Sequence, residues 1–316
     1  MGTGSGQPVT PPLLRLAGTS LSFGSRTLWS GLDLEVAAGE FLAVLGPNGT
    51  GKTSLLKAIL GQQALSTGTI SFLGEPVARA RRRIGYIPQQ KLIEAGTPVR
   101  ARDLVTMGIN GHRWGFGLPT PAMRARVDAA LEAVGATHYA DAPAATLSGG
   151  EQQRVRVAQA VVDRPALLLC DEPLISLDLA NQRSVSELIN AQRQNLGSAV
   201  VFVTHDVNPI LEMVDRVLYL ARGQFRIGTA DEVLRSEVLS ELYQTPVDVF
   251  RAHGRIAVVG GPDEHAAHGS LAHHADHDPS THPRAHADEH AEEQDQERDH
   301  EREHGSDRTA ERSDVA

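Results

Sequence analysis

The chain has 316 residues, of which 41% are hydrophobic, and a formal net charge of −9 at pH 7. This length and apolar content allow a sizeable core, in one large domain or two small ones. The acidity lies at one end, because residues from Asp263 onward carry 16 of the 39 acidic residues and 5 of the 30 basic ones. The other 262 residues, with 23 acids and 25 bases, are nearly neutral. That balance argues against a general nucleic-acid binder, which would show a basic face.

The cysteine content and the N-terminus exclude further classes. Cys170 is the single cysteine, so an internal disulfide and a cysteine-based zinc finger are excluded. Residues 1–12 are rich in Gly, Pro and Thr without the basic and apolar regions of a secretory signal, which predicts a disordered leader. No apolar run approaches the roughly 18 residues of a membrane-spanning helix. If the protein works at a membrane, another chain must supply the pore.

From Leu13 onward, strand-like and helix-like segments alternate. Strands are predicted at 32–36, 40–46, 69–74, 82–88, 167–173 and 199–206, and a hairpin with a glycine turn at 216–228. Helices are predicted at 52–63, 123–135, 151–162, 181–194 and 230–243. Such alternation predicts an α/β fold, with a mostly parallel sheet covered by helices on both faces. A helix-rich insert, about 91–163, divides that sheet domain in the sequence.

The segment GPNGTGKT, Gly46–Thr53, is a phosphate-binding loop with a buried strand before it and a helix after it. Its glycines let successive N–H groups point at phosphates, and the helix N-terminus adds favourable partial charge. Lys52 supplies a cation for the β- and γ-phosphate oxygens, and the Thr53 hydroxyl can ligate Mg²⁺. A glycine-rich turn that matches by chance is the alternative, and the flanking strand and helix argue against it. The predicted nucleotide contacts of this loop are Gly46, Pro47, Asn48, Gly49, Thr50, Gly51, Lys52, Thr53 and Ser54.

Polar residues follow two further buried strands. Asp171 ends the run LLLCD, which would carry it to the carboxyl edge of a parallel sheet, where it can hold Mg²⁺. Glu172 follows it and is the natural general base for an attacking water. His205 ends AVVFVTH and could reach a γ-phosphate, and Gln89 closes the strand before the insert. Without the phosphate loop, these would be ordinary polar residues at strand ends.

The segment LSGGEQQR, Leu147–Arg154, identifies the family. With these motifs in this order, the chain resembles the ATP-binding subunits of ABC transporters over residues 13 to about 250. The resemblance implies a RecA-like P-loop NTPase core with an antiparallel β subdomain and an inserted helical subdomain. It assigns Mg²⁺ to Thr53, Gln89 and Asp171, and catalytic roles to Glu172, His205 and Gln89. The further nucleotide contacts that it implies are Phe23, which would stack on adenine, Ser148, Gly149, Gly150 and Asp178.

The family also implies how such a chain works. Residues 13–258 would form the ATP-binding domain, at the cytoplasmic face of the cell membrane as a peripheral subunit. Two copies, expected to be identical, would close head to tail around ATP and drive integral-membrane permease subunits. Glu151 stands where many members have Gln, and Phe23 replaces a commoner Tyr. Neither difference argues against ATP hydrolysis.

The sequence indicates the transported substrate, or cargo, less directly than it indicates the ATPase activity. The stretches beginning at Val99, Thr204 and Val238 are similar to the subfamily for zinc, manganese and related metals. That subfamily works with an extracytoplasmic metal-binding protein. Importers of iron chelates, siderophores or cobalamin carry related sequences and stay an alternative. Non-transport relatives in DNA repair, chromosome structure or translation place coiled coils or zinc modules between the phosphate-binding loop and the LSGGEQQR segment, which we call the signature segment. Only about 95 residues separate Thr53 from Ser148 here, without heptads or cysteine pairs, which favours transport.

Residues 259–316 are predicted to be a disordered tail rich in histidine and acid. Of the 14 histidines, 10 lie between His265 and His304. Imidazoles and carboxylates are good ligands for Zn²⁺, so weak metal binding at several sites is expected. An extension that only keeps the protein soluble is the alternative. The candidate ligands are His265, His268, His273, His274, His277, His282, His286 and His290.

Overall fold

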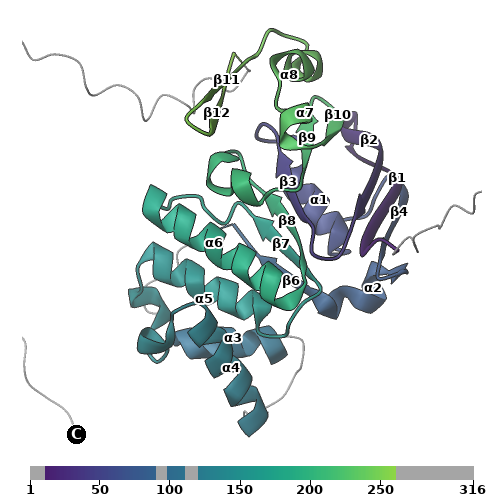
Figure 1. Cartoon of the computed structure of the whole chain (residues 1–316). Helices are drawn as coiled ribbons and strands as arrows, with labels where there is room; N and C mark the ends of the chain where they lie inside the picture. The colour runs from purple at the N-terminus through teal and green to yellow at the C-terminus, as the bar shows by residue number, and fades with distance from the viewer. Residues whose placement is uncertain (1–10, 90–97, 111–119, 261–316) are drawn as a thin grey trace, which may run out of the picture. The chain divides into compact units, whose positions relative to one another are not determined.

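The computed structural model describes residues 11–89, 98–110 and 120–260, and its centre is a six-stranded sheet (Figure 1). The strand order is β10-β9-β3-β8-β7-β6. Neighbours from β9 to β6 are parallel, and β10 is antiparallel to β9. The strands are β3 (Phe41–Leu45), β6 (Ile84–Ile87), β7 (Leu167–Asp171), β8 (Ala199–Val203), β9 (Arg216–Ala221) and β10 (Gln224–Gly228). This confirms the predicted parallel-rich sheet.

The central strands are buried on both faces, which explains their continuous apolar sequences. Every residue of β3, β7 and β8 is buried. Because side chains alternate along a strand, they supply two separate cores. Phe41 and Phe202 face one core, where their rings stack with centroids 5.6 Å apart. Leu42 and Val201 face the other. Cys170 is a buried residue of the first core.

One face of the main sheet packs on α1 (Lys52–Ile59) and a four-stranded antiparallel sheet of order β2-β1-β4-β5. Trp29 is fully buried there. The predicted strand at 32–36 is the end of a longer strand. The strands are β1 (Leu14–Phe23), β2 (Arg26–Val36), β4 (Thr67–Phe72) and β5 (Glu75–Pro76). Helix α2 (Val77–Ala80) and a 3₁₀ turn, η1 (Arg81–Arg83), lead into β6, so the strand predicted at 82–88 is shorter than expected.

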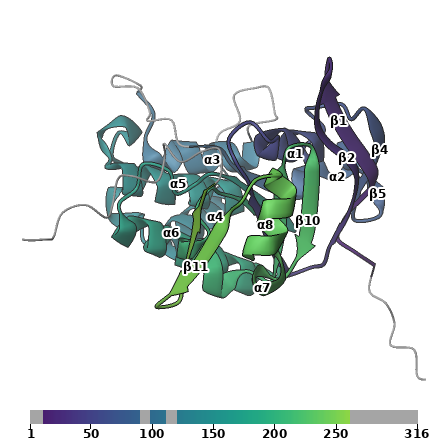
Figure 2. The same cartoon turned by 90° about the horizontal axis from the view of Figure 1, so that it is seen from above.

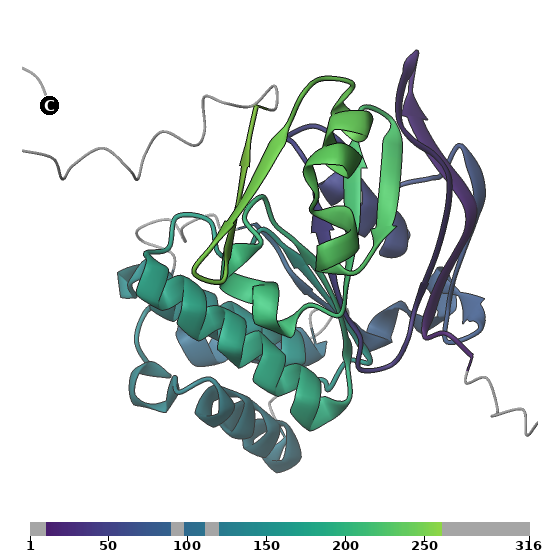
Figure 3. The same cartoon turned by 45° about the horizontal axis from the view of Figure 1, so that its top comes forward.

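Helices cover the other face (Figure 3). The predicted insert contains α3 (Ala101–Asn110), α4 (Pro121–Ala133) and α5 (Gly149–Val161), with 3₁₀ turns η2 (Thr137–Tyr139) and η3 (Ala144–Thr146). Helix α3 packs against α4 and α5, and α5 also packs against α6 (Leu179–Leu196). The 3₁₀ helix η4 (Asn208–Met213) packs against α6. Among the described residues, no helix is both long and apolar enough to cross a membrane.

The single helix predicted at 230–243 is wrong, because the structure divides it into α7 (Ala230–Val233) and α8 (Ser236–Tyr243). Arg235 is extended, with φ −129° and ψ 146°, which interrupts the helical hydrogen bonds. This turn lets Leu234 reach the same core as Leu239, and both are buried. Burial of these two side chains therefore overrides the helical periodicity of the segment.

A β-hairpin follows, β11 (Asp248–Ala252) and β12 (Arg255–Val259), with β11 next to α8 (Figure 2). The predicted boundary after residue 258 falls one residue before the end of β12. The tail histidines from His265 to His290 and residues 1–10 of the predicted leader lie outside the described residues.

Candidate functional site

The phosphate-binding loop connects the end of β3 to the start of α1, as predicted. Gly46, Gly49 and Gly51 have φ values of 137°, 77° and 101°, a region that L-residues with a side chain rarely adopt. At Gly46 a Cβ atom would lie 2.0 Å from the carbonyl oxygen of Leu220 in β9. The loop therefore depends on glycine both for its backbone conformation and for its close approach to the sheet.

Two cations hold the carbonyl groups of this loop. Lys52, only 5% exposed, donates from Nζ to the carbonyl oxygens of Gly46 (2.6 Å) and Pro47 (3.0 Å). Arg26 at the start of β2 donates from Nη2 to the Gly49 carbonyl oxygen at 2.7 Å. A cavity of about 380 Å³ adjoins the loop between β2 and the β9–β10 turn. The loop thus brings a lysine cation and a helix N-terminus next to an open cavity, an arrangement that suits binding of a polyphosphate.

Asp171 and Thr53 place two side-chain oxygens, both possible metal ligands, next to each other at the loop. The Thr53 hydroxyl donates to Asp171 Oδ1 at 3.0 Å. Asp171 ends β7 at the carboxyl edge of the sheet and is 3% exposed. A carboxylate and a hydroxyl are ligands that Mg²⁺ prefers. The residues therefore fit the ion that the sequence predicts here.

Tyr86 of β6 also contacts Asp171, and the sequence analysis did not single it out. Its hydroxyl donates to Asp171 Oδ2 at 3.2 Å. Burial, together with the negative charge of Asp171, raises the pKa of Tyr86 to about 12. The hydroxyl therefore stays protonated and can donate this hydrogen bond throughout the physiological pH range.

The three candidate catalytic residues lie at the ends of strands. Glu172 has a φ of 46°, and its N–H donates to the Val203 carbonyl oxygen at 3.0 Å, so the next strand fixes its strained backbone. Gln89 Nε2 lies 3.5 Å from Glu172 Oε2, at the limit of a hydrogen bond. His205 follows β8 and is exposed. Phe23, at the end of β1, has 50% of its surface exposed and is available for stacking.

The residues of the signature segment gather at a second place. Ser148 is the N-cap of α5 and forms a capping box with Glu151, in which each side chain bonds to the other residue's backbone N–H. A Cβ on Gly150 would lie 2.7 Å from Asn181 Oδ1. Asn181 in turn donates to Asp178, the N-cap of α6. Ser148, Gly149, Gly150 and Asp178 therefore lie at the neighbouring N-termini of α5 and α6.

The capping box predicts a pH effect on stability. Hydrogen bonds from the Ser148 hydroxyl and backbone N–H lower the pKa of Glu151 below its ordinary value. A lowered carboxyl pKa stabilises the fold above the unfolded value of about 4.3, and this is lost as pH falls through the folded value. Glu151→Gln keeps a capping side chain but removes the charge. We expect it to be less stable at pH 7 by about 0.3–1 kcal/mol.

Thermal unfolding of the natural chain and of Glu151→Gln between pH 7 and pH 3.5 measures this effect. The gap in Tm should be full above about pH 5 and should narrow as the pH falls through the lowered pKa of Glu151. A gap that does not change with pH would show that the Glu151 charge does not stabilise α5.

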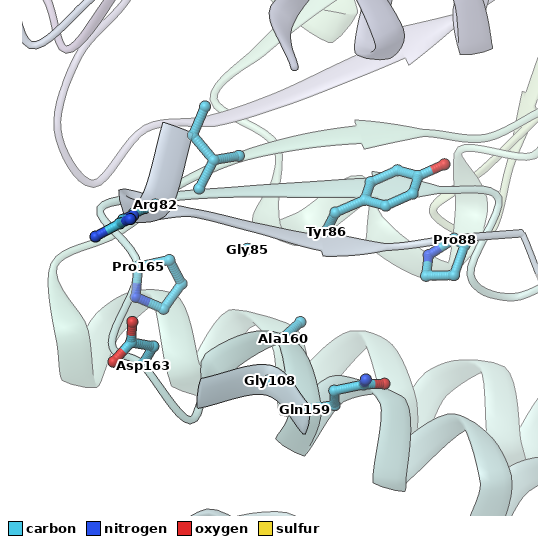
Figure 4. Close-up of a pocket in the computed structure, with 10 residues that line it drawn as sticks. Arg82, Gly85, Tyr86, Pro88, Gly108, Gln159, Ala160, Asp163 and Pro165 are labelled. Carbon is cyan, nitrogen blue, oxygen red and sulfur yellow. The ribbon is translucent and has the colours of Figure 1, made fainter. Parts of the chain in front are cut away.

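A further cavity, of about 340 Å³, lies between β6, α3 and α5 (Figure 4). We call it the β6–α5 cavity. Two glycines bring its walls together: a Cβ on Gly85 would lie 2.5 Å from the Ala160 carbonyl oxygen, and one on Gly108 would lie 2.2 Å from that of Gln159. The cavity thus adjoins both the helical insert and the strand that leads to Gln89.

Comparison with known proteins identifies the family. The ABC transporter family model matches residues 29–175. A zinc import ATP-binding protein, ZnuC 1 of Hahella chejuensis, is 33% identical over 268 residues, which cover 84% of this chain and 98% of the relative. The chain belongs to the ATP-binding subunits of ABC transporters. As such a subunit it is an ATPase that acts with membrane permease components.

Two further matches are to proteins of metal and metal-chelate transport systems, and they confirm the fold of the ABC subunit. The manganese transport system ATP-binding protein MntB of Halalkalibacterium halodurans is 29% identical and covers 78% of this chain and 98% of the relative. The structure of a metal-chelate type ABC transporter in an inward-facing conformation matches with a TM-score of 0.67 and 28% identity, over 78% of this chain and 96% of that one. The expected core, antiparallel subdomain and helical insert are therefore confirmed.

Proposed function

We propose that this ABC subunit hydrolyses ATP to drive import of a divalent metal ion, zinc or manganese. The observation that carries the cargo proposal is the extent of similarity: a zinc import subunit and a manganese transport subunit each match over 98% of their length. The site supports the ATPase chemistry, because a phosphate loop, the oxygen ligands of Thr53 and Asp171, and the Glu172 carboxylate at a strand end lie together. We place the subunit at the cytoplasmic face of the membrane.

Each predicted site residue has a chemical role in this proposal. The loop residues from Gly46 to Ser54 would bind the phosphates, and Phe23 would stack on adenine. Thr53, Asp171 and Gln89 would hold Mg²⁺, which supplies charge neutralisation at the phosphates when it is bound. Glu172 would accept a proton from the attacking water, and its fixed backbone suits this role. His205 is exposed after the end of β8, the strand next to β7 in the sheet. It would bond to the γ-phosphate.

A second copy of the chain would complete the site. The N-terminus of α5 carries Ser148, Gly149 and Gly150, whose N–H groups can bind a phosphate held by another copy. Asp178, at the adjacent N-terminus of α6, would lie in the same interface. Because each chain has one phosphate loop, two chains, which we infer to be identical, make two sites. No nucleic acid is expected as a partner, given the near-neutral body.

The β6–α5 cavity is where we place contact with the permease. It opens beside β6 and α3, and β6 leads directly to Gln89. A permease segment seated there would move with the helical insert when two copies close. An extracytoplasmic metal-binding protein would deliver the ion to the permease.

The histidine-rich tail after β12 would bind Zn²⁺ through its histidines, as a local reservoir or sensor. Its composition supports this, since imidazole and carboxylate groups suit that ion. Within the described part of the chain, no group of three or more His, Cys, Asp or Glu residues could hold a metal ion. A solubilising extension is the alternative role.

Total cellular metal, measured in a strain lacking this chain and grown in metal-poor medium, tests the cargo. We expect a deficit of zinc or manganese that is restored by the natural chain and not by Lys52→Ala, which loses the cation of the phosphate loop. A chain ending after Gly261 tests the tail: reduced zinc content would support a metal role, and full restoration would favour the solubilising role.

The same measurement separates the second candidate function. The similarity to a metal-chelate type transporter favours an iron chelate or cobalamin as alternative cargo. Unchanged zinc and manganese with a deficit of iron or cobalt would establish that alternative and contradict the zinc or manganese proposal.

A further inference from the structure

Asp171 is held by two different elements of the fold. Thr53 from α1 donates to its Oδ1 at 3.0 Å, and Tyr86 from β6 donates to its Oδ2 at 3.2 Å. Strands β6 and β7 are parallel neighbours, with Ile87 opposite Cys170, so the tyrosine approaches from the adjacent strand. Both carboxylate oxygens thus have a hydroxyl donor, and Asp171 as a whole is only 3% exposed.

This arrangement fixes the plane of the carboxylate. The terminal torsion of an aspartate is broad and has little intrinsic preference, so hydrogen bonds decide how the carboxylate is turned. One donor alone would leave the group free to rotate about its bond to Cβ. With donors on both oxygens, Oδ1 keeps its direction toward Thr53, the other residue that would hold Mg²⁺.

We propose that Tyr86 is a positioning residue for the Mg²⁺ site, acting through its hydrogen bond to Asp171 Oδ2. The inference rests on the proposed assignment of Asp171 to Mg²⁺ and adds a residue outside the predicted site. Residues that orient a metal ligand typically change metal affinity by about 10–100-fold when they are lost.

Tyr86 also joins this site to the β6–α5 cavity. Tyr86 is among the residues that line the cavity, while its ring lies on the opposite side of β6 from Ala160 and Gln159 (Figure 4). A shift of β6 caused by a ligand in that cavity would therefore move the hydroxyl that orients Asp171. Tyr86 therefore connects the cavity, on one side of β6, with Asp171, which its side chain contacts on the other side.

Tyr86→Phe tests the inference, because it removes the hydroxyl and keeps the ring. The measurement is the affinity for the non-hydrolysable analogue AMP-PNP, by calorimetry, in saturating Mg²⁺ and in EDTA. The ratio of the two dissociation constants reports how much the metal strengthens binding. We expect this ratio to fall about tenfold in Tyr86→Phe, with affinity in EDTA unchanged.

Two further variants make the result decisive. Tyr139→Phe is the matched control, since the Tyr139 hydroxyl is buried without a hydrogen-bond partner in the described structure, and its ratio should equal that of the natural chain. Asp171→Asn should lower the ratio if Asp171 belongs to the Mg²⁺ site. If the ratio of dissociation constants is unchanged in Tyr86→Phe but lowered in Asp171→Asn, the proposed role of Tyr86 is wrong and the Mg²⁺ assignment stands. Natural ratios in both overturn the Mg²⁺ assignment itself.

Discussion

Glu172→Gln should bind ATP as the natural chain does and hydrolyse it at least about 100-fold more slowly, the usual size of a general-base contribution. The amide keeps the shape of the side chain but cannot accept a proton from water. The backbone should not change, because the Glu172 N–H bonds to Val203 and its φ of 46° does not depend on the carboxylate. Steady-state phosphate release and AMP-PNP binding, measured on one preparation, give the two quantities.

Glu187→Gln is the matched control for this prediction. Glu187 is an exposed residue of α6 that pairs with Arg183. The substitution therefore makes the same change of carboxylate to amide on a solvated surface. Its hydrolysis rate should match that of the natural chain. If Glu172→Gln also keeps the natural rate, Glu172 is not the general base, and a different residue activates the water.

Gly46→Ala should destabilise the fold by about 3 kcal/mol or more and abolish ATP binding. The new Cβ would lie 2.0 Å from the Leu220 carbonyl oxygen, and the φ of 137° is unfavourable for any side chain. Relief requires the phosphate loop to move away from β9. Chemical denaturation gives the free energy of unfolding, and calorimetry gives ATP affinity.

Gly39→Ala separates the two causes of that effect. Gly39 has a φ of 73° with no atom within 4 Å of the added Cβ, so alanine there adds only backbone strain, about 1–2 kcal/mol. It should keep ATP affinity. Equal losses of stability in the two variants would show that the contact with Leu220 costs nothing.

The sequence predicts the parts of this fold in which local pattern and packing agree. The all-apolar strands β3, β7 and β8 are buried on both faces, and a burial-driven pattern needs no knowledge of partners. The phosphate loop is equally predictable, since its glycine spacing follows from backbone conformations that other residues avoid. Asp171 lies at the carboxyl edge because the strand that carries it ends there.

Other features depend on contacts between distant segments and leave little trace in the sequence. Tyr86 and Asp171 are 85 positions apart, and only the pairing of β6 with β7 brings them together. Arg26 reaches Gly49 because the first strands fold over the loop. The break at Arg235 results from burial of Leu234, which periodicity alone cannot reveal. A polar residue in a strand next to the Asp171 strand is the signal that could have identified Tyr86.

The most direct test of the two-copy ATP site is the mass of the Glu172→Gln chain in solution, by light scattering, with and without Mg-ATP. Because this variant should hold ATP without hydrolysing it, we predict that its mass doubles when Mg-ATP is added. Adding Lys52→Ala to the same chain should return it to one copy, since the phosphate loop then lacks its cation. A Glu172→Gln chain that binds Mg-ATP with full affinity and stays a single copy would contradict a site completed by Ser148, Gly149 and Gly150 of a second chain.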